Sequence, residues 1–291
     1  MLFGEHAVVY NRPCLVTAVS SRIRVAIEKT NGDFKIEAPQ VKDVRFVEET
    51  VRIFQDKFKI GNGLAIKTES DFSSKYGFGS SSAVTTAILK GLGEFFNLSL
   101  SKKDIFDLGY RVTLSVQGIG SGFDIAAADY GGILYFITAG QVIKPLSVDN
   151  LPLVIGYSGV KADTPIMVNN LKLKMKQKSE KIENIFNKIT QIVENAQKEL
   201  ENKNWGKLGQ LMNKNHNLLQ NLSVSTQKLD KMCQGAILAG AWGAKLSGAG
   251  GGDCMIALVS KEKRKAVEKA IEKVGGEIIK INTCAEGVRM E

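Results

Sequence analysis

The sequence predicts an α+β protein with two lobes. Strand-like segments alternate with helix-like segments before about residue 160, whereas helical periodicity dominates afterwards. The second part closes on a glycine run, a strand, a helix and another strand. A chain of 291 residues is long enough for two domains of ordinary size. We therefore expect one lobe over residues 1–155 and a second over residues 156–291.

Before residue 160 the expected elements follow from two hydrophobic periods. Alternating or β-branched apolar residues predict strands at residues 14–29 (one or two strands), 33–39, 63–70, 131–140 and 152–159. Apolar residues at helical spacing predict helices at residues 44–58, 83–100 and 103–117. A turn at Asn31–Gly32 separates the first two strand segments, and Ser101 stands where it would cap the last of these helices.

After residue 160 one long amphipathic helix dominates the pattern. Its apolar face would comprise Ile182, Ile185, Phe186, Ile189, Ile192, Val193, Ala196 and Leu200. Further helices are expected at residues 207–222, 225–241 and 261–275, and strands at residues 254–259 and 276–284.

The chain carries a formal net charge of +9, from 39 Lys and Arg against 30 Asp and Glu. Many lysines fall in helix-like stretches, such as residues 172–188 and 261–273, where glutamates are interspersed. Aromatic residues make up only 7% of the chain, and no stacking platform or recognition-helix pattern is visible. We therefore predict no nucleic-acid partner, and we interpret the lysines as solvated helix faces that favour small anionic substrates.

Hydropathy and cysteine usage predict the compartment. No apolar run approaches the ~20 residues that span a bilayer, and charge interrupts the apolar start at residues 2–10, unlike in a signal peptide. The 4 cysteines lack CxxC spacing, and only His6 and His216 could join them in a zinc site. These observations predict a cytoplasmic protein with reduced thiols, no membrane association and no structural zinc.

The segment GFGSSSA, Gly77–Ala83, stands directly before a predicted helix. Small residues let backbone N–H groups converge, and the helix start adds the positive end of its dipole, so the segment predicts a site for an anion such as phosphate. It has neither the Gly-Lys-Ser/Thr of a Walker loop nor the third glycine of the dinucleotide fingerprint. The alternative is a tight loop where backbones approach closely.

A second glycine run spans residues 248–252 and allows the same two interpretations. Glycines that lead straight into a strand cost folding entropy, and we expect them to contribute nothing to packing there. Taken together, the two runs favour opposing walls of one polyphosphate site.

Four polar residues have both a structural and a functional interpretation. Asp124, in GSGFDIAAADYGG, either caps the helix that follows or directs a carboxylate into a cleft, where it accepts or orients the proton of a substrate hydroxyl. Glu5 and His6 either form a turn with a hydrogen-bonded histidine or face a substrate. For His216, in an amphipathic helix, we favour a helix-surface or interface position.

With the motifs LFGEHAVVY, GFGSSSA, GSGFD and KLSGAGGGDC in this order, the chain resembles the GHMP kinases over nearly its whole length. Within that family, LFGEHAVVY and LMNKNHNLLQNLSVS are most similar to the mevalonate kinases, whereas GSGFD and GAGGGDC are also similar to the phosphomevalonate kinases. The resemblance implies a two-lobed fold with a ribosomal-protein-S5-like N-terminal α/β lobe and a helical, ferredoxin-like C-terminal lobe. It also implies a homodimer.

Carried over residue by residue, the resemblance implies an ATP-dependent kinase that phosphorylates the 5-hydroxyl of mevalonate with Mg²⁺ as cofactor. The ATP phosphates would be bound by residues of both glycine runs, namely Gly77, Phe78, Gly79, Ser80, Ser81, Ser82, Gly248, Ala249 and Gly250. Ser81 matches the serine whose hydroxyl helps to hold Mg²⁺, and Asp124 matches the catalytic aspartate. Substrate-side residues are matched by Glu5, His6 and Thr164.

Two departures from the family pattern leave alternatives open. The family's lysine in an APGK segment precedes LFGEH, whereas this sequence begins Met1-Leu2-Phe3. Mevalonate kinases place a Mg²⁺-binding glutamate eleven residues before the aspartate, at the position of Thr113, and phosphomevalonate kinases typically lack it. The leading hypothesis is a mevalonate kinase; a phosphomevalonate kinase and a weakly active or inactive nucleotide-binding relative are the alternatives.

Overall fold

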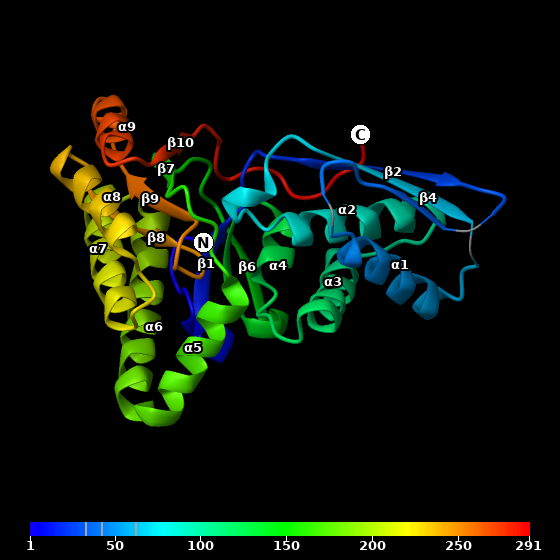
Figure 1. Cartoon of the computed structure of the whole chain (residues 1–291), viewed down its shortest axis with the longest axis horizontal. Coiled ribbons are helices and arrows are strands. Elements are labelled where there is room, and N and C mark those ends of the chain that lie inside the picture. The colour runs from blue at the N-terminus through cyan, green and yellow to red at the C-terminus, as the bar shows by residue number, and fades with distance from the viewer. Residues whose placement is uncertain (33, 42, 62) are drawn as a thin grey trace.

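In the computed structural model, residues 1–32, 34–41, 43–61 and 63–291 are described, and within them the strands form three separate sheets. Helices cover these sheets, which confirms the predicted α+β class. The molecule is elongated, with the N-terminal helices and strands at one end and the C-terminal ones at the other (Figure 1).

The first half of the chain contributes two sheets. Strands β1 (Pro13–Thr17), β5 (Ile133–Ile137) and β6 (Val142–Leu146) form an antiparallel sheet in the order β1-β5-β6. In the other sheet, β4 (Leu64–Ser70) lies between β2 (Ile23–Lys29), to which it is antiparallel, and β3 (Lys35–Glu37), to which it is parallel. The predicted segment 14–29 therefore resolves into two strands.

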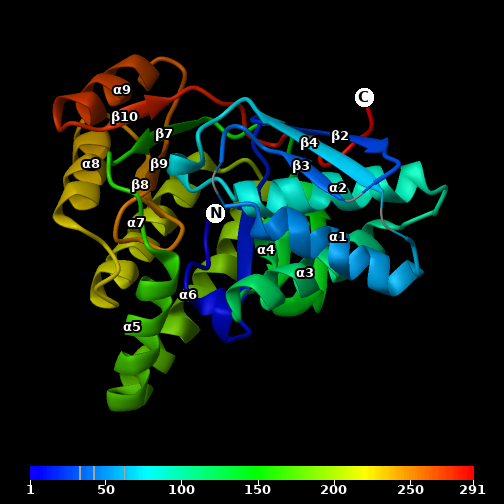
Figure 2. The same cartoon turned by 45° about the vertical axis from the view of Figure 1, so that its right-hand side comes forward.

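Four α-helices and three short 3-10 helices complete this half. The α-helices are α1 (Arg45–Phe58), α2 (Ser80–Phe95), α3 (Lys102–Gln117) and α4 (Phe123–Tyr130). The 3-10 helices are η1 (Ala7–Tyr10), η2 (Ser74–Tyr76) and η3 (Thr138–Gly140). Figure 2 shows α1 and α2 beneath the β2–β4–β3 sheet, where apolar side chains of helices and strands form one core cluster. Ser101 caps α3 in a capping box with Asp104, as expected.

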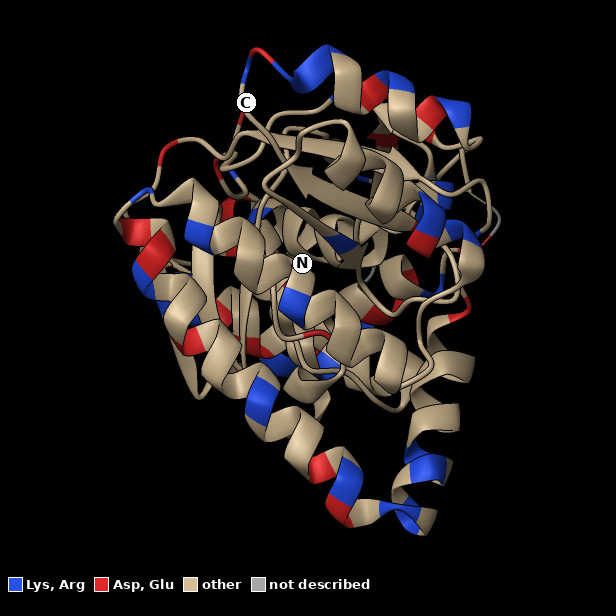
Figure 3. Ribbon diagram, turned by 90° about the vertical axis from the view of Figure 1, so that its left-hand side faces the viewer, with Lys and Arg blue, Asp and Glu red and all other residues tan. Residues whose placement is uncertain are grey.

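The second half contributes an antiparallel sheet in the order β10-β7-β9-β8. Its strands are β7 (Leu153–Tyr157), β8 (Gly243–Ser247), β9 (Cys254–Leu258) and β10 (Glu277–Ile279). The helices are α5 (Thr164–Gln177), α6 (Ser179–Glu201), α7 (Trp205–Asn221), α8 (Gln227–Leu238) and α9 (Arg264–Lys273). Lys and Arg are interspersed with Asp and Glu along α6, α8 and α9, as expected for solvated faces, whereas α5 and α7 carry Lys without acidic residues (Figure 3).

The buried face of α6 is the one that the sequence predicted, residue for residue. It packs in a single apolar cluster that also contains Leu2, Phe3, Leu15 and Ile133 from the start and middle of the chain. The N-terminal segment is therefore part of the core that α6 covers, whereas the β2–β4–β3 sheet and its helices have a core cluster of their own.

One expected turn is confirmed, and one expected strand needs correction. Residues 31–32 bend the chain between β2 and β3, as expected, and β4 lies between these two strands in the sheet. Asp33, the first residue of the strand expected at 33–39, lies outside the described residues. The strand expected at 276–284 ends at Ile279; the chain then runs back along the N-terminal half, with a bridge between Val19 and Thr283 and its end beside β2 (Figure 1).

None of the helices in the described ranges is both long enough and apolar enough to cross a bilayer.

Candidate active site

A cavity of about 1180 Å³ opens between the two halves of the molecule. Its walls come from the first glycine run, the start of α4, the segment before α5 and the second glycine run. Segments far apart in the sequence therefore share one space, as expected if the two glycine runs form opposing walls.

The first glycine run turns sharply into α2. Gly77 and Gly79 have φ of +70° and +72°, a left-handed conformation that L side chains rarely adopt. Gly79 is the N-cap of α2 and offers no capping side chain, so the first N–H groups of that helix, at Ser80 and Ser81, need outside acceptors. Phe78, Ser80, Ser81 and Ser82 also line the cavity. The loop thus has the backbone geometry of an anion site.

Asp124 lies in the first turn of α4, in the wall of this cavity. The N-cap of α4 is Gly122 and no side chain caps the helix, so the capping interpretation of Asp124 is wrong. A Cβ placed on Gly79 would lie 3.4 Å from Asp124 Oδ1, so the carboxylate borders the glycine loop. The side chain is open to solvent within the cleft, but the surrounding protein desolvates it and raises its pKa to about 6.

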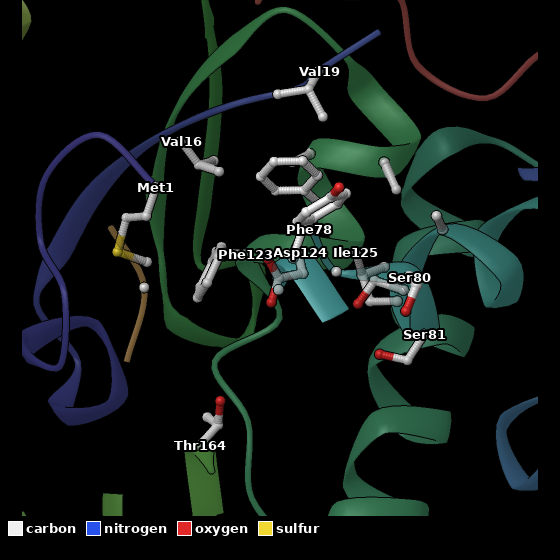
Figure 4. A pocket seen from close by; sticks show the side chains of 18 of the residues that line it. Met1, Val16, Val19, Phe78, Ser80, Ser81, Phe123, Asp124, Ile125 and Thr164 are labelled. Carbon is white, nitrogen blue, oxygen red and sulfur yellow. The ribbon is translucent and has the colours of Figure 1, made fainter. Parts of the chain in front are cut away.

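Two hydroxyl groups point into the same space as Asp124. Figure 4 shows Ser81 on α2 and Thr164 at the start of α5, each directed toward the open region beneath the carboxylate. These three side chains come from three different helices, and only the fold brings them together.

The second glycine run has two distinct functions in the structure. Gly248, with φ of +98° and no atom near its missing Cβ, lines the cavity together with Ala249. By contrast, a Cβ on Gly250 would collide with the carbonyl of Val224, and one on Gly252 with the carbonyl of Val160. The expectation that these glycines contribute nothing to packing is therefore wrong, and Gly250 does not line the cavity.

Glu5 and His6 lie behind the second glycine run. The Glu5 carboxylate pairs with Lys245 Nζ and accepts a hydrogen bond from Asn215 Nδ2 at 3.4 Å, and it is fully shielded from solvent. His6 adopts φ of +60° and donates from Nε2 to the carbonyl of Ala249 at 2.7 Å. Burial lowers the pKa of His6, so the ring is neutral near pH 7.

His216 lies inside the interface between α7, α8 and β8, as the interface interpretation expected. Its Nδ1 accepts a hydrogen bond from the Leu246 N–H at 3.3 Å, and its Nε2 donates to Asp230 Oδ1 at 3.1 Å. Burial lowers its pKa. His216 therefore stabilises the strand that leads to the second glycine run.

The described residues of the cavity provide few side chains for a metal ion. Thr113 lies in the cavity wall, but its hydroxyl donates to the carbonyl of Gly109 within α3 at 3.0 Å. In the ranges that the structure covers, no group of three or more His, Cys, Asp and Glu side chains could hold a metal ion. Ser81 and Asp124 are two of the oxygen donors that line the cavity, and they suit Mg²⁺, which takes few protein ligands and completes its shell with phosphate and water.

Sequence reasoning missed two residues of this region, Lys245 and Asp253. Lys245 has no exposed side-chain area, and Asp253 is only 9% exposed. The signal for Lys245 was a lysine inside an apolar strand, and for Asp253 a carboxylate that ends a glycine run. Neither signal identifies the partner, because each partner lies far away in the sequence.

The cavity, the two glycine runs and the cleft carboxylate define a small-molecule kinase, and comparison with known proteins identifies its family. Residues 45–132 match the model of the GHMP kinases N terminal domain, and residues 196–277 match that of the GHMP kinases C terminal. The chain belongs to the GHMP kinase family.

Within this family the chain is similar over its full length to several mevalonate kinases. The mevalonate kinase of Thermococcus onnurineus is 36% identical over all of this chain and 96% of its own length. That of Pyrococcus abyssi is 35% identical over all of this chain and 95% of its own length. The crystal structure of L. major mevalonate kinase in complex with R-mevalonate superimposes with a TM-score of 0.83 at 27% identity, over 99% of this chain and 94% of that one.

Proposed function

We propose that this protein transfers the γ-phosphoryl group of ATP to the 5-hydroxyl of mevalonate and so supplies 5-phosphomevalonate for isoprenoid synthesis. The full-length similarity to mevalonate kinases supports the substrate. The single structural observation that carries the chemistry is the Asp124 carboxylate, which borders the phosphate loop at Gly79 and faces the cavity.

Asp124 accepts or orients the proton of the mevalonate hydroxyl as that oxygen attacks the γ-phosphorus in line. Its pKa of about 6 leaves the carboxylate mostly ionised at neutral pH but basic enough to accept a proton. Phosphoryl transfer needs little covalent chemistry from the protein, so the remaining residues bind and position the two substrates.

The backbone of Gly77–Ser82 and the residues Gly248 and Ala249 bind the ATP phosphates in this proposal. Left-handed glycines let the backbone approach the phosphate oxygens, and the start of α2 adds its dipole. Gly250 does not contact the phosphates in this proposal; it packs against Val224 and so supports the loop that does. Ser81 and Asp124 are the residues that would hold Mg²⁺, which neutralises charge on the phosphates when it is bound.

On the substrate side, Thr164 offers its hydroxyl directly to the cavity. His6 and Glu5 line the same space, but His6 is hydrogen-bonded to Ala249 and Glu5 is paired with Lys245. We therefore propose that these two residues hold the cavity wall on the mevalonate side in place, in addition to facing the substrate. The proposed division between residues 1–155 and 156–291 falls inside β7, which pairs with β9 and β10, so in this proposal the second lobe begins at about residue 153; the two matched family segments lie on either side of it. A cytoplasmic homodimer is part of the same proposal.

A coupled ADP-release assay with mevalonate and phosphomevalonate, measured side by side, tests the function. We expect turnover with mevalonate and little with phosphomevalonate. Turnover with phosphomevalonate alone would assign the protein to the phosphomevalonate kinases, and nucleotide binding without turnover of either would make it an inactive relative.

A further inference from the structure

Each left-handed glycine of the phosphate loop borders a carboxylate. Gly79 borders Asp124, as described above. A Cβ on Gly77 would lie only 2.6 Å from Asp253 Oδ2 and 2.8 Å from Asp253 Cγ. The two carboxylates come from α4 and from the end of the second glycine run, and they approach the loop at positions only two residues apart.

Asp253 is held firmly in this position. Its backbone N–H donates to the carbonyl of Val160 at 2.7 Å, and its own carbonyl accepts a hydrogen bond from the Ser158 N–H at 2.8 Å. Its side-chain Oδ1 accepts a hydrogen bond from the Ala162 N–H at 2.9 Å. The remaining oxygen, Oδ2, receives no hydrogen bond from the described residues and faces Gly77.

A carboxylate in this position is unfavourable for a bare polyphosphate. Like charges a few ångströms apart repel more strongly in a partly desolvated cleft than in water. Asp253 is 9% exposed, and burial raises its pKa, which the Ala162 N–H and the nearby Lys161 partly offset. A cation between Asp253 and the phosphates would convert this repulsion into attraction.

Mg²⁺ in nucleotide sites is usually held by one or two carboxylates together with phosphate oxygens. Thr113, which stands where the resemblance places a glutamate ligand, uses its hydroxyl within α3. We propose that Asp253, which borders Gly77 as Asp124 borders Gly79, supplies the second carboxylate that binds Mg²⁺·ATP. This inference rests on the proposed ATP site, and it makes nucleotide binding depend on Mg²⁺ through a residue at the end of the second glycine run.

Titration calorimetry with ATP alone, without mevalonate, tests the inference. The dissociation constant of ATP is measured in Mg²⁺ and in EDTA for the wild type, Asp253→Asn and the control Asp163→Asn. Asp163 lies in the same cavity wall but caps α5, and asparagine preserves that cap. In the wild type and the control we expect a smaller dissociation constant of ATP in Mg²⁺ than in EDTA. In Asp253→Asn the ratio of the two constants should be ~10-fold lower. In EDTA this variant should bind ATP as tightly as the wild type or more tightly.

The alternative is that Asp253 only stabilises the contact between the second glycine run and the segment of residues 158–162. In that case Asp253→Asn would weaken ATP binding equally in Mg²⁺ and in EDTA, and the inference would be wrong. Failure of the wild type to bind ATP under any condition would instead overturn the proposed function, so the two failures are distinguishable.

Asparagine tolerates the φ of +54° at this position, and glycine does so without strain. Asp253→Gly is therefore a second variant that removes the carboxylate, and thermal melting checks that both variants fold. Electron paramagnetic resonance of Mn²⁺ with a non-hydrolysable ATP analogue gives an independent readout. We expect tight Mn²⁺ binding in the wild type and a ~10-fold weaker affinity in both variants; wild-type Mn²⁺ affinity in a folded variant would contradict the inference.

Discussion

Glu5 and Lys245 form an ion pair with no solvent-exposed side-chain area, although 240 residues separate them in the sequence. Lys245 Nζ also donates to the carbonyl of Leu246 at 2.6 Å, and Asn215 binds the second carboxylate oxygen. The pair joins the segment before η1 to β8, the strand that leads into the second glycine run. A contact of this kind fixes the N-terminal segment against the strand that carries the second glycine run.

Removal of one partner from this pair should strongly destabilise the protein. Lys245→Met leaves the Glu5 carboxylate buried without its cation, and such changes cost about 3–5 kcal/mol. Urea unfolding measures the loss. The exposed pair of Lys103 and Asp107 on α3 provides the control, because Lys103→Met should cost under about 1 kcal/mol.

The double variant Lys245→Met/Glu5→Gln tests the cause of that loss. It leaves no unpaired buried charge, so we expect it to be more stable than Lys245→Met alone. A loss for Lys245→Met no larger than for Lys103→Met would refute the buried pair.

Gly79→Ala should weaken ATP binding. Its φ of +72° disfavours a side chain, and the added Cβ would lie 3.4 Å from Asp124 Oδ1, on the surface that the phosphates approach. Gly118 is a matched control with the same φ and no atom within 4 Å of its missing Cβ. Calorimetry should give a larger dissociation constant for Gly79→Ala and an unchanged one for Gly118→Ala; equal constants for both variants would mean that the loop does not contact ATP.

Asp124→Asn should lower turnover by ~10²–10⁴, because a base or orienting group contributes about that much, while ATP binding measured in EDTA is largely kept. The wild-type rate should also depend on pH through this residue. Its pKa is raised to about 6, and the reactive form is the carboxylate, so kcat/KM should fall about tenfold per pH unit below about 6. A near-normal rate in Asp124→Asn, or a flat profile down to pH 5, would remove Asp124 from the mechanism.

Asp129 on α4 gives a prediction about stability and pH. The residue has no exposed area, neither carboxylate oxygen has a partner among the described residues, and burial raises its pKa to about 7. The folded state therefore holds the proton more tightly than the unfolded state, where the pKa is about 3.9. The contribution of protonated Asp129 to the free energy of unfolding is complete below about pH 4 and is lost as pH rises through about 7.

Asp129→Asn cannot ionise, so its melting temperature relative to wild type should increase as pH rises, to roughly 5 °C above wild type at pH 8. Asp107→Asn, at an exposed pair on α3, is the control and should show little change. A difference between Asp129→Asn and wild type that is the same at pH 5 and pH 8 would show that Asp129 does not titrate in this range.

Local patterns predicted the parts of the fold that depend on local physics. The buried face of α6 followed from helical spacing, and the start of α3 followed from its capping serine. Other elements lack such signals. β6 is an edge strand that contains Pro145. α5 is rich in lysine and buries only two residues, Val168 and Leu171, so its apolar periodicity is weak.

The same division holds for the candidate site. The phosphate loop and Asp124 were predicted because motifs mark them. Gly250 was misjudged because its packing partner, Val224, lies in the loop between α7 and α8, which is distant in the sequence. Lys245 and Asp253 were missed because their roles depend on distant residues: Lys245 pairs with Glu5, and Asp253 borders Gly77. No local sequence pattern indicates these contacts.

The most direct test of the central claim is identification of the product from ATP, Mg²⁺ and mevalonate by ³¹P nuclear magnetic resonance. We predict one new phosphomonoester signal, coupled to the two protons of a methylene group and equimolar with ADP, and its loss in Asp124→Asn. No phosphomonoester from mevalonate under conditions where phosphomevalonate yields a diphosphate would contradict the proposed function.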